Sequence, residues 1–129
     1  MQKIKQQFQT INYMKSINIK RAYDDKSEDD GYRVLIDRLW PRGVSKKDAH
    51  FDEWLKDLAP TTELRKWFDH DPDRFDEFRK RYKKELEGHK EELDKLRNRA
   101  KSETITLLFA AKNEEMNNAV VVREVLEEG

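Results

Sequence analysis

The sequence contains no cysteine, few glycines and prolines, and no long apolar run. Its 129 residues include 0 Cys, 4 Gly and 3 Pro. The absence of Cys excludes disulfides, thiolate metal sites and cysteine nucleophiles. With so little Gly and Pro, the chain is neither collagen-like nor a flexible linker. No segment reaches the roughly 18 consecutive apolar residues of a membrane span, so no membrane association is expected.

The amino-terminal segment also lacks the apolar core of a secretory signal. Residues 1–15 are polar, with Ile11 and Tyr13 outside any continuous apolar stretch. Together with the missing Cys, this predicts a cytoplasmic protein. Met14 leaves an alternative start open, and an ordinary frayed or partly helical terminus is the other interpretation. We expect residues 1–16 to be an extension that is either poorly ordered or present only in the expressed chain. We expect residues 17–129 to form a single domain.

Neither sign of charge is in excess. The 27 Lys and Arg balance the 27 Asp and Glu, and the formal net charge is zero. This excludes broad, non-specific attraction to nucleic acid or to anionic membranes, although a local basic patch remains compatible with it. Apolar residues make up only 36%, but 3 Trp, 4 Tyr and 6 Phe enlarge the core that the chain can bury.

Three short apolar segments predict β-strands over residues 17–23, 32–40 and 104–111. Continuous apolar centres of this length are typical of strands covered on both faces, as in a parallel sheet. The long link between the second and third strands predicts a crossover, which makes them parallel neighbours. The short link between the first two, residues 24–31, favours an antiparallel hairpin. The predicted fold class is α/β, with a small, mostly parallel sheet flanked by helices.

The stretch between the second and third strands is predicted to be helical. Asp71 is a good N-cap, and Pro72 suits the first helical position. Beyond them, apolar residues at helical spacing form one stripe: Phe75, Phe78, Tyr82, Leu86, Leu93 and Leu96. An unbroken helix over residues 72–100 would be about 45 Å long at 1.5 Å per residue, and Gly88 is the expected bend. A last helix is expected after Asn113.

Two polar clusters follow the second and third strands. Residues 37–43 read Asp-Arg-Leu-Trp-Pro-Arg-Gly, and residues 111–113 read Ala-Lys-Asn. Ligands of open parallel sheets bind at the carboxyl ends of the strands. Pro41 disfavours a continued strand ladder and Gly43 permits a tight turn, so the chain should turn here. The two clusters therefore predict a pocket for a phosphate or a carboxylate at this edge.

The residues predicted to bind the anion are mostly cationic. They are Arg38, Trp40, Arg42, Arg65, Lys112 and Asn113. Asp37 is the carboxylate nearest this group; it would act as a general base or orient Arg38 or Arg42. The structural alternative is that Arg38 pairs with Asp37 or another acid while Trp40 only packs.

Metal and cofactor signatures are weak. The histidines at 50, 70 and 89 are isolated, so no metal site is predicted. The sequence has no Gly-rich phosphate loop, nucleophile elbow or dinucleotide fingerprint, and no cofactor follows from it.

Several segments resemble the YeaO-like family of bacterial proteins, a branch of the domain-of-unknown-function 488 group. The specific match is the Asp-Arg-Leu-Trp-Pro-Arg-Gly run within residues 30–43; residues 20–24, 60–68, 107–113 and 118–121 support it. The resemblance implies a small cytoplasmic α/β domain whose motifs gather at one sheet edge. It also implies a parallel first strand that brings Tyr23 to the pocket.

Members of the wider group often have a Cys and a Glu after the third strand, where this sequence has Ala110 and Lys112. That departure puts in question any chemistry that depends on the pair. The sequence thus predicts a protein that binds a small phosphate- or nucleotide-like anion, with hydrolysis or group transfer as the reaction if there is one. The alternative is a non-catalytic module associated with nucleic acid, using the basic run over residues 79–84.

Overall fold

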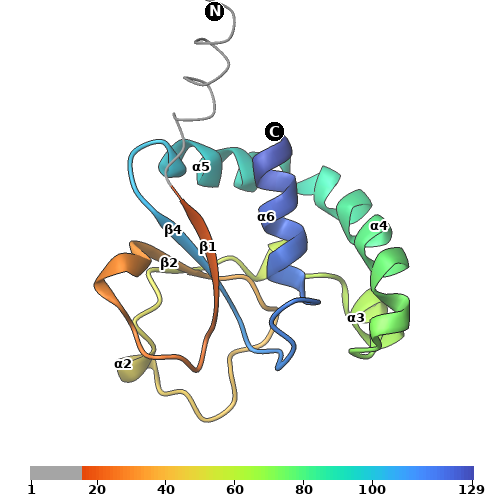
Figure 1. Cartoon of the computed structure of the whole chain (residues 1–129), viewed down its shortest axis with the longest axis horizontal. Coiled ribbons are helices and arrows are strands. Elements are labelled where there is room, and N and C mark those ends of the chain that lie inside the picture. The colour runs from red at the N-terminus through yellow and green to blue at the C-terminus, as the bar shows by residue number, and fades with distance from the viewer. Residues whose placement is uncertain (1–15) are drawn as a thin grey trace, which may run out of the picture.

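A four-stranded parallel sheet forms the centre of the molecule (Figure 1). The structure, a computed structural model, describes residues 16–129. The strands are β1 (Ile17–Arg21), β2 (Tyr32–Leu35), β3 (Glu53–Trp54) and β4 (Ile105–Phe109). Their order is β1-β4-β2-β3, and every neighbouring pair is parallel. The predicted α/β class and the parallel pairing of the second and third predicted strands, β2 and β4, are confirmed.

The expected antiparallel hairpin between the first two strands is wrong. β1 pairs with β4, with Ile17 opposite Ile105 and Arg21 opposite Phe109. The link between β1 and β2 crosses the sheet through a short 3-10 helix, η1 (Glu28–Asp30), and so reaches the far side of β4. The parallel direction implied by the family resemblance is the observed one. The expected extension over residues 1–16 lies, except for Ser16, outside the described residues.

Gly31 lets β2 start directly beside β4. Its φ is +62°, and a Cβ at this position would lie 2.2 Å from the Thr104 carbonyl oxygen. Residues with a side chain rarely adopt a positive φ, and the position also leaves no room for a Cβ atom. The close approach allows the Tyr32 N–H to donate to the Thr104 carbonyl at 2.9 Å, the first bond between the two segments.

The predicted helical stretch consists of several pieces. They are η2 (Lys56–Leu58), α3 (Thr62–Phe68), η3 (Pro72–Arg74), α4 (Phe75–Leu86), η4 (Glu87–His89) and α5 (Lys90–Ala100). Asp71 caps the first turn as predicted, accepting a bond from the Asp73 N–H. The bend falls at Gly88, inside η4, as expected. The last helix, α6, spans Asn118–Glu128.

The main core lies between one face of the sheet and the helices. The strands contribute Val34, Ile105, Leu107 and Phe109, and Ile36 follows β2; all five are 1% exposed or less. Every residue of the predicted apolar stripe on α4 and α5 is buried in the same core. α5 and α6 lie next to the strands, whereas α3 and α4 lie further out (Figure 1).

The other face of the sheet is covered by loops. A small second core joins Leu35 and Leu108 to the aromatic rings of Trp40, Phe51 and Trp54. The sequence patterns did not predict two elements near these loops, β3 and the short helix α2 (Lys46–Ala49). β3 has only two residues, too few for a periodic pattern to reveal.

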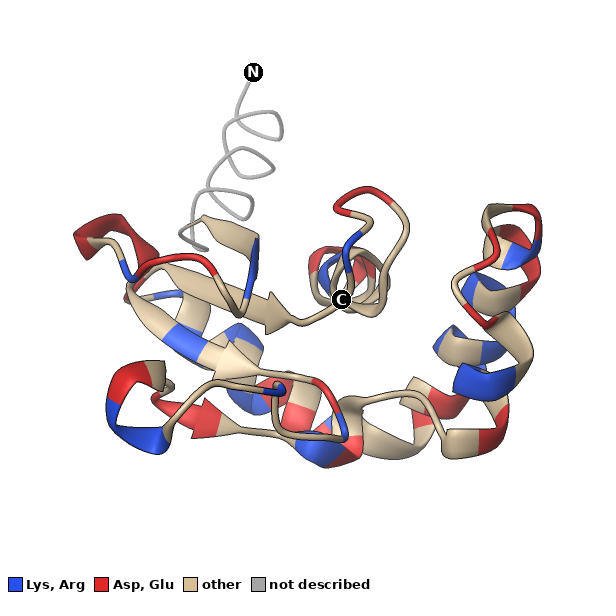
Figure 2. Cartoon of the chain, turned by 90° about the horizontal axis from the view of Figure 1, so that it is seen from below, with Lys and Arg blue, Asp and Glu red and all other residues tan. Residues whose placement is uncertain are grey.

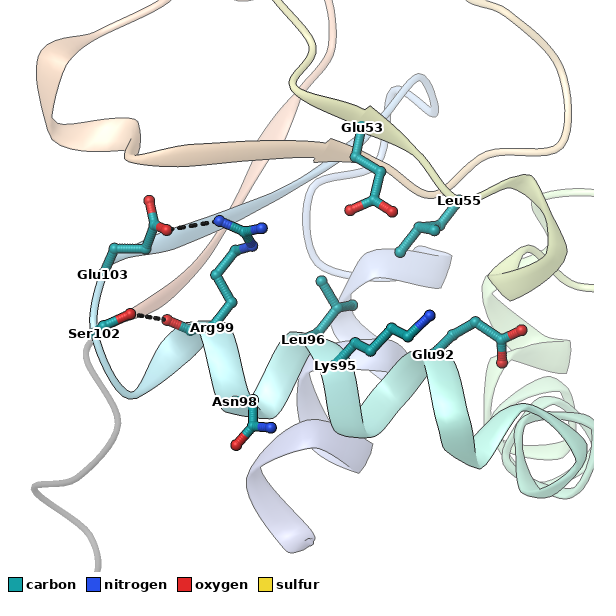
Figure 3. A pocket seen from close by; sticks show the side chains of 9 residues that line it. All are labelled: Glu53, Leu55, Glu92, Lys95, Leu96, Asn98, Arg99, Ser102 and Glu103. Atoms are coloured by element: carbon teal, nitrogen blue, oxygen red, sulfur yellow. Dashed lines mark hydrogen bonds and ion pairs between the residues drawn. The ribbon is translucent and has the colours of Figure 1, made fainter.

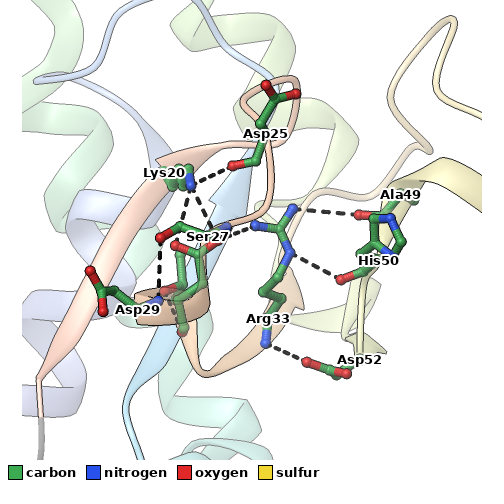
Figure 4. A network of polar contacts seen from close by, with 10 residues as sticks. Lys20, Asp25, Ser27, Asp29, Arg33, Ala49, His50 and Asp52 are labelled. Carbon is green, nitrogen blue, oxygen red and sulfur yellow. Dashed lines mark hydrogen bonds and ion pairs between the residues drawn. The ribbon is translucent and has the colours of Figure 1, made fainter.

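A buried ionic network holds the loops on this second face (Figure 4). Arg33, 1% exposed, pairs with Asp30 and donates to the carbonyl oxygens of His50 and Ala49. Lys20 also pairs with Asp30, at 3.1 Å. The network thereby links β1, η1, β2 and the loop before β3.

Candidate functional site

The two polar clusters meet at a cavity of about 560 Å³ at the carboxyl ends of β2 and β4. We call it the edge cavity. Its lining comes from four segments: residues 37–42, residues 59–70 around α3, residues 110–111 after β4, and residues 116–118 at the start of α6, with Phe78 from α4. Trp40 and Ala111 both line it, which confirms that the two clusters lie at the same end of the sheet.

Asp37 lies at this edge without a cationic partner. Its Oδ2 accepts a bond from the Ala110 N–H at 2.9 Å, and its Oδ1 accepts one from the Asn118 amide at 3.0 Å. No Lys, Arg or His of the described chain comes within ion-pair distance of it. The expectation that Asp37 orients Arg38 or Arg42 is therefore wrong, because its carboxylate points to the backbone of β4 and to α6.

Burial raises the pKa of the Asp37 carboxyl. The bonds from Asn118 and the Ala110 N–H, and the positive charges of Arg65 and His70, oppose this shift without cancelling it. Asp37 is thus a partly buried carboxylate whose charge is stabilised by dipoles and by more distant cations.

Arg38, Arg42 and Arg65 all line the same cavity. The Arg38 guanidinium donates to the carbonyl oxygens of Ala59 and Pro60, both at 3.4 Å, which are long hydrogen bonds. Arg42 lies on an exposed turn, and Arg65 lies on the exposed side of α3. The structure thus brings together three of the predicted anion-binding side chains from two separate segments.

These arginines differ from most others in the chain in having no carboxylate partner. Seven arginines form ion pairs: Arg33, Arg74, Arg79, Arg81, Arg97, Arg99 and Arg123. Within residues 16–129, Arg38, Arg42 and Arg65 form none, and Arg21 instead donates to the carbonyl oxygens of Ala110 and Ala111. All four lie towards the carboxyl edge of the sheet. Three of these four guanidinium groups, those of Arg38, Arg42 and Arg65, line the edge cavity itself.

Trp40 both packs and lines the edge cavity. Its ring lies 5.1 Å from that of Phe51 and 5.5 Å from that of Trp54, and its indole N–H donates to the Val44 carbonyl at 2.6 Å. Trp40 therefore packs, as the alternative interpretation expects, but it also lines the cavity. For Arg38 that interpretation is wrong, because Arg38 forms no ion pair with any acid in the described part of the chain.

Three other predicted ligand-binding residues lie outside the cavity lining. Tyr23 is 42% exposed, and its ring lies under the Arg21 guanidinium at 5.1 Å. Lys112 is exposed, and Asn113 accepts bonds from the N–H groups of Glu115 and Met116. Asn113 therefore stabilises the turn before α6.

Sequence reasoning missed the two asparagines that follow this turn. The Asn117 side chain caps α6 by accepting the Val120 N–H at 3.0 Å. The Asn118 amide donates to Asp37 and to the Ile36 carbonyl. The Asn-Asn pair at a helix start was a visible capping signal, but its link to Asp37 depends on the packing of α6 against the sheet.

A second cavity of about 500 Å³ lies between β3 and α5 (Figure 3). Its arginine, Arg99, is matched by an acid of the same lining, whereas Lys95 forms no ion pair within the described residues. Arg99 pairs with Glu103 at 2.8 Å, and Glu53 accepts the Tyr32 hydroxyl at 2.8 Å. This cavity is a weaker candidate for an anion site because its arginine is already neutralised.

The basic run on α4 is partly matched by acids: within the described residues, three of its five cations form ion pairs, Arg79, Arg81 and Lys83. Arg79 pairs with Asp76 and Glu124, and Arg81 pairs with Glu77. Both acidic and basic residues lie along this helix (Figure 2). In residues 16–129, no His, Asp and Glu side chains gather into a group of three that could hold a metal ion, and no helix is long and apolar enough to span a bilayer.

Comparison with known proteins identifies the family. A family model described as the inactive DUF488-N3 subclade matches residues 16–129. The chain belongs to the DUF488 family. This confirms the family resemblance, because the Asp-Arg-Leu-Trp-Pro-Arg-Gly run and the segment after β4 both lie inside the matched residues.

The DUF488 chain is similar over most of its length to proteins described only as uncharacterized. It is 45% identical over 111 residues to YeaO of Escherichia coli, covering 86% of this chain and 96% of YeaO. It is 41% identical over 112 residues to Rv3073c of Mycobacterium tuberculosis, covering 85% of this chain and 92% of that protein. No solved structure matches it significantly.

Proposed function

We propose that this DUF488 protein binds a small phosphate- or carboxylate-bearing molecule, such as a nucleotide-like compound, in the edge cavity without transforming it. The observation that supports this most strongly is the convergence of Arg38, Arg42 and Arg65 on one cavity without carboxylate partners. Guanidinium groups bind oxyanions through two parallel N–H bonds, and an unpaired one is available for such a ligand. The volume lies within the range of small-molecule sites, about 300–1,000 Å³.

The chemistry of the lining supports binding over catalysis. No lining side chain within residues 16–129 has a hydroxyl, a thiol or a primary amine, and Asp37 and His70 are its only acid–base groups. Ala110 lines the cavity after β4, where members of the wider group often have Cys. The matching family model describes its subclade as inactive. Hydrolysis or transfer would thus have to proceed by direct attack of water or a second substrate, with Asp37 as the base.

Arg42→Lys tests the proposal because Arg42 has no hydrogen-bond or ion-pair partner in the described chain. We expect its thermal unfolding midpoint without ligand to equal that of the wild type. Inorganic phosphate and adenosine monophosphate should raise the wild-type midpoint, since a ligand that binds only the folded state at 100 times its Kd adds about 2.7 kcal/mol. The variant should lose most of that increase, because lysine has no planar fork of donors.

The matched control is Arg123→Lys on α6, outside the edge cavity, which should keep the full increase. No increase with any anion in the wild type, or an unchanged increase in Arg42→Lys, would reject the proposal. The nucleic-acid alternative predicts salt-dependent binding of a single-stranded oligonucleotide. A fluorescence anisotropy titration at two salt concentrations tests that alternative directly.

A further inference from the structure

We infer that the ligand of the edge cavity carries a second group of opposite charge, a primary ammonium that binds to Asp37 while its anionic group binds to the arginines. The inference rests on the proposed function and specifies its ligand class: small aminoalkyl phosphates or amino carboxylates.

The first support is that opposite charges share this cavity without pairing. Asp37, Arg38 and Arg42 all line it, yet no carboxylate oxygen of residues 16–129 comes within 4.0 Å of either guanidinium. The Ala110 N–H and the Asn118 amide hold the Asp37 carboxylate towards β4 and α6, whereas Arg38 points to the carbonyls of Ala59 and Pro60. Both kinds of charge therefore remain available to a ligand.

The second support is the unused bonding capacity of Asp37. A carboxylate has about four acceptor positions on its two oxygens. Here each oxygen accepts one bond from the protein, so about two positions remain. An ammonium, with three N–H donors, can fill them and provide the counter-ion that the protein does not. A partly buried carboxylate without a counter-ion is unfavourable, so pairing with an ammonium would contribute to the binding free energy of the ligand.

The other charged neighbours are compatible with this arrangement. Arg65 and His70 lower the pKa of Asp37 from a distance but do not contact its carboxylate within ion-pair range. Arg65 is exposed, so its charge is screened by solvent and it is available to the anionic group. The apolar lining, including Phe68, Phe78 and Met116, suits a short carbon chain between the two ligand groups.

The test compares O-phosphoethanolamine with ethyl phosphate, which lacks only the amino group, by isothermal titration calorimetry on the full chain. We expect the wild type to bind O-phosphoethanolamine about tenfold more tightly, as one charge-assisted hydrogen-bonded contact would give. In Asp37→Asn, ethyl phosphate should bind as in the wild type or more tightly, and the advantage of the amino group should fall below about twofold. Asp94→Asn on α5, outside the cavity, is the matched control and should keep the tenfold difference.

The outcomes separate this inference from the proposed function. Equal affinity of both phosphates for the wild type overturns the inference and leaves the proposed function intact. No binding of either phosphate overturns the inference, and it overturns the proposed function as well if inorganic phosphate and adenosine monophosphate also fail to raise the wild-type midpoint. An advantage that persists in Asp37→Asn overturns the assignment to Asp37. If that variant unfolds, Asp37→Ser, which also lacks the carboxylate, replaces it in the same comparison.

Discussion

Arg33 and Asp30 are the most deeply buried charged pair in the described chain, and they lie on the loop-covered face of the sheet. Burial alone would raise the pKa of the Asp30 carboxyl, but bonds from the Ser27 N–H, Lys20 and Arg33 lower it below its ordinary value of 3.8. Arg33 also donates to backbone carbonyls before β3, so the pair connects three segments. Removing one partner of such a pair leaves the other charge buried and uncompensated.

Asp30→Asn should therefore destabilise the protein at pH 7, by roughly 3–5 kcal/mol as for other broken buried pairs. A lowered pKa means that the stabilisation is present above the unfolded-state pKa, near 3.8, and is lost as the pH falls through the lower folded-state value. The difference in unfolding free energy between wild type and variant, measured by urea unfolding from pH 7 to pH 2.5, should decrease below pH 3.8.

Asp76→Asn is the control for this experiment, since the Asp76 side chain is 94% exposed. Its effect should stay within about 0.5 kcal/mol at every pH, as for most surface substitutions. If the unfolding free energy of Asp30→Asn differs from that of the wild type by the same amount at every pH, the ionic explanation is contradicted and packing explains the loss.

The helices are held together by an aromatic cluster that joins α3 to α4. The rings of Phe68 and Phe78 stack at 4.2 Å, and Phe75 and Tyr82 lie on either side of Phe78 at 5.9 and 5.4 Å. The Tyr82 hydroxyl donates to the Leu58 carbonyl, which connects α4 to the segment before α3. Because α3 supplies Arg65 and α4 supplies Phe78, the cluster also positions one wall of the edge cavity.

Phe78→Ala should lower the unfolding free energy by about 3–5 kcal/mol, through lost burial and the cavity left behind. Phe78 is only 2% exposed, so the variant loses nearly all of the burial free energy of the removed ring. Lys80→Ala on the exposed side of the same helix should change stability by less than about 0.5 kcal/mol. A midpoint for Phe78→Ala equal to that of Lys80→Ala in a denaturant titration would show that the stripe does not stabilise the fold.

At the scale of the whole molecule, the family model matches residues 16–129. Within those residues one main core runs through the sheet and the helices, and Ile17 of β1 packs against it. We therefore propose that residues 16–129 form the folding unit. A chain beginning at Ser16 should unfold within about 1 °C of the full chain in a thermal scan, since a change of 1 kcal/mol shifts the midpoint of such a domain by several degrees. A large decrease would show that the first 15 residues stabilise the domain.

Local patterns in the sequence determined much of the fold and part of the candidate site. Asp71 and Pro72 start a helix, Gly88 bends it, and the apolar stripe on α4 and α5 faces the core, because capping and helical periodicity act between residues close in sequence. The polar run after β2 and the segment after β4 were placed at one edge, because a parallel crossover puts both carboxyl ends together.

Only the tertiary structure decided which groups pair. An eight-residue link is compatible with a hairpin, yet β1 lies beside β4 because η1 carries the chain across the sheet and Asp30 is anchored there by Lys20 and Arg33. The same holds at the edge cavity. Asp37 binds Ala110 and Asn118, more than 70 positions away, and its neighbouring arginines stay unpaired. Pairings of this kind depend on distances between segments remote in sequence, which residue type and spacing alone do not specify.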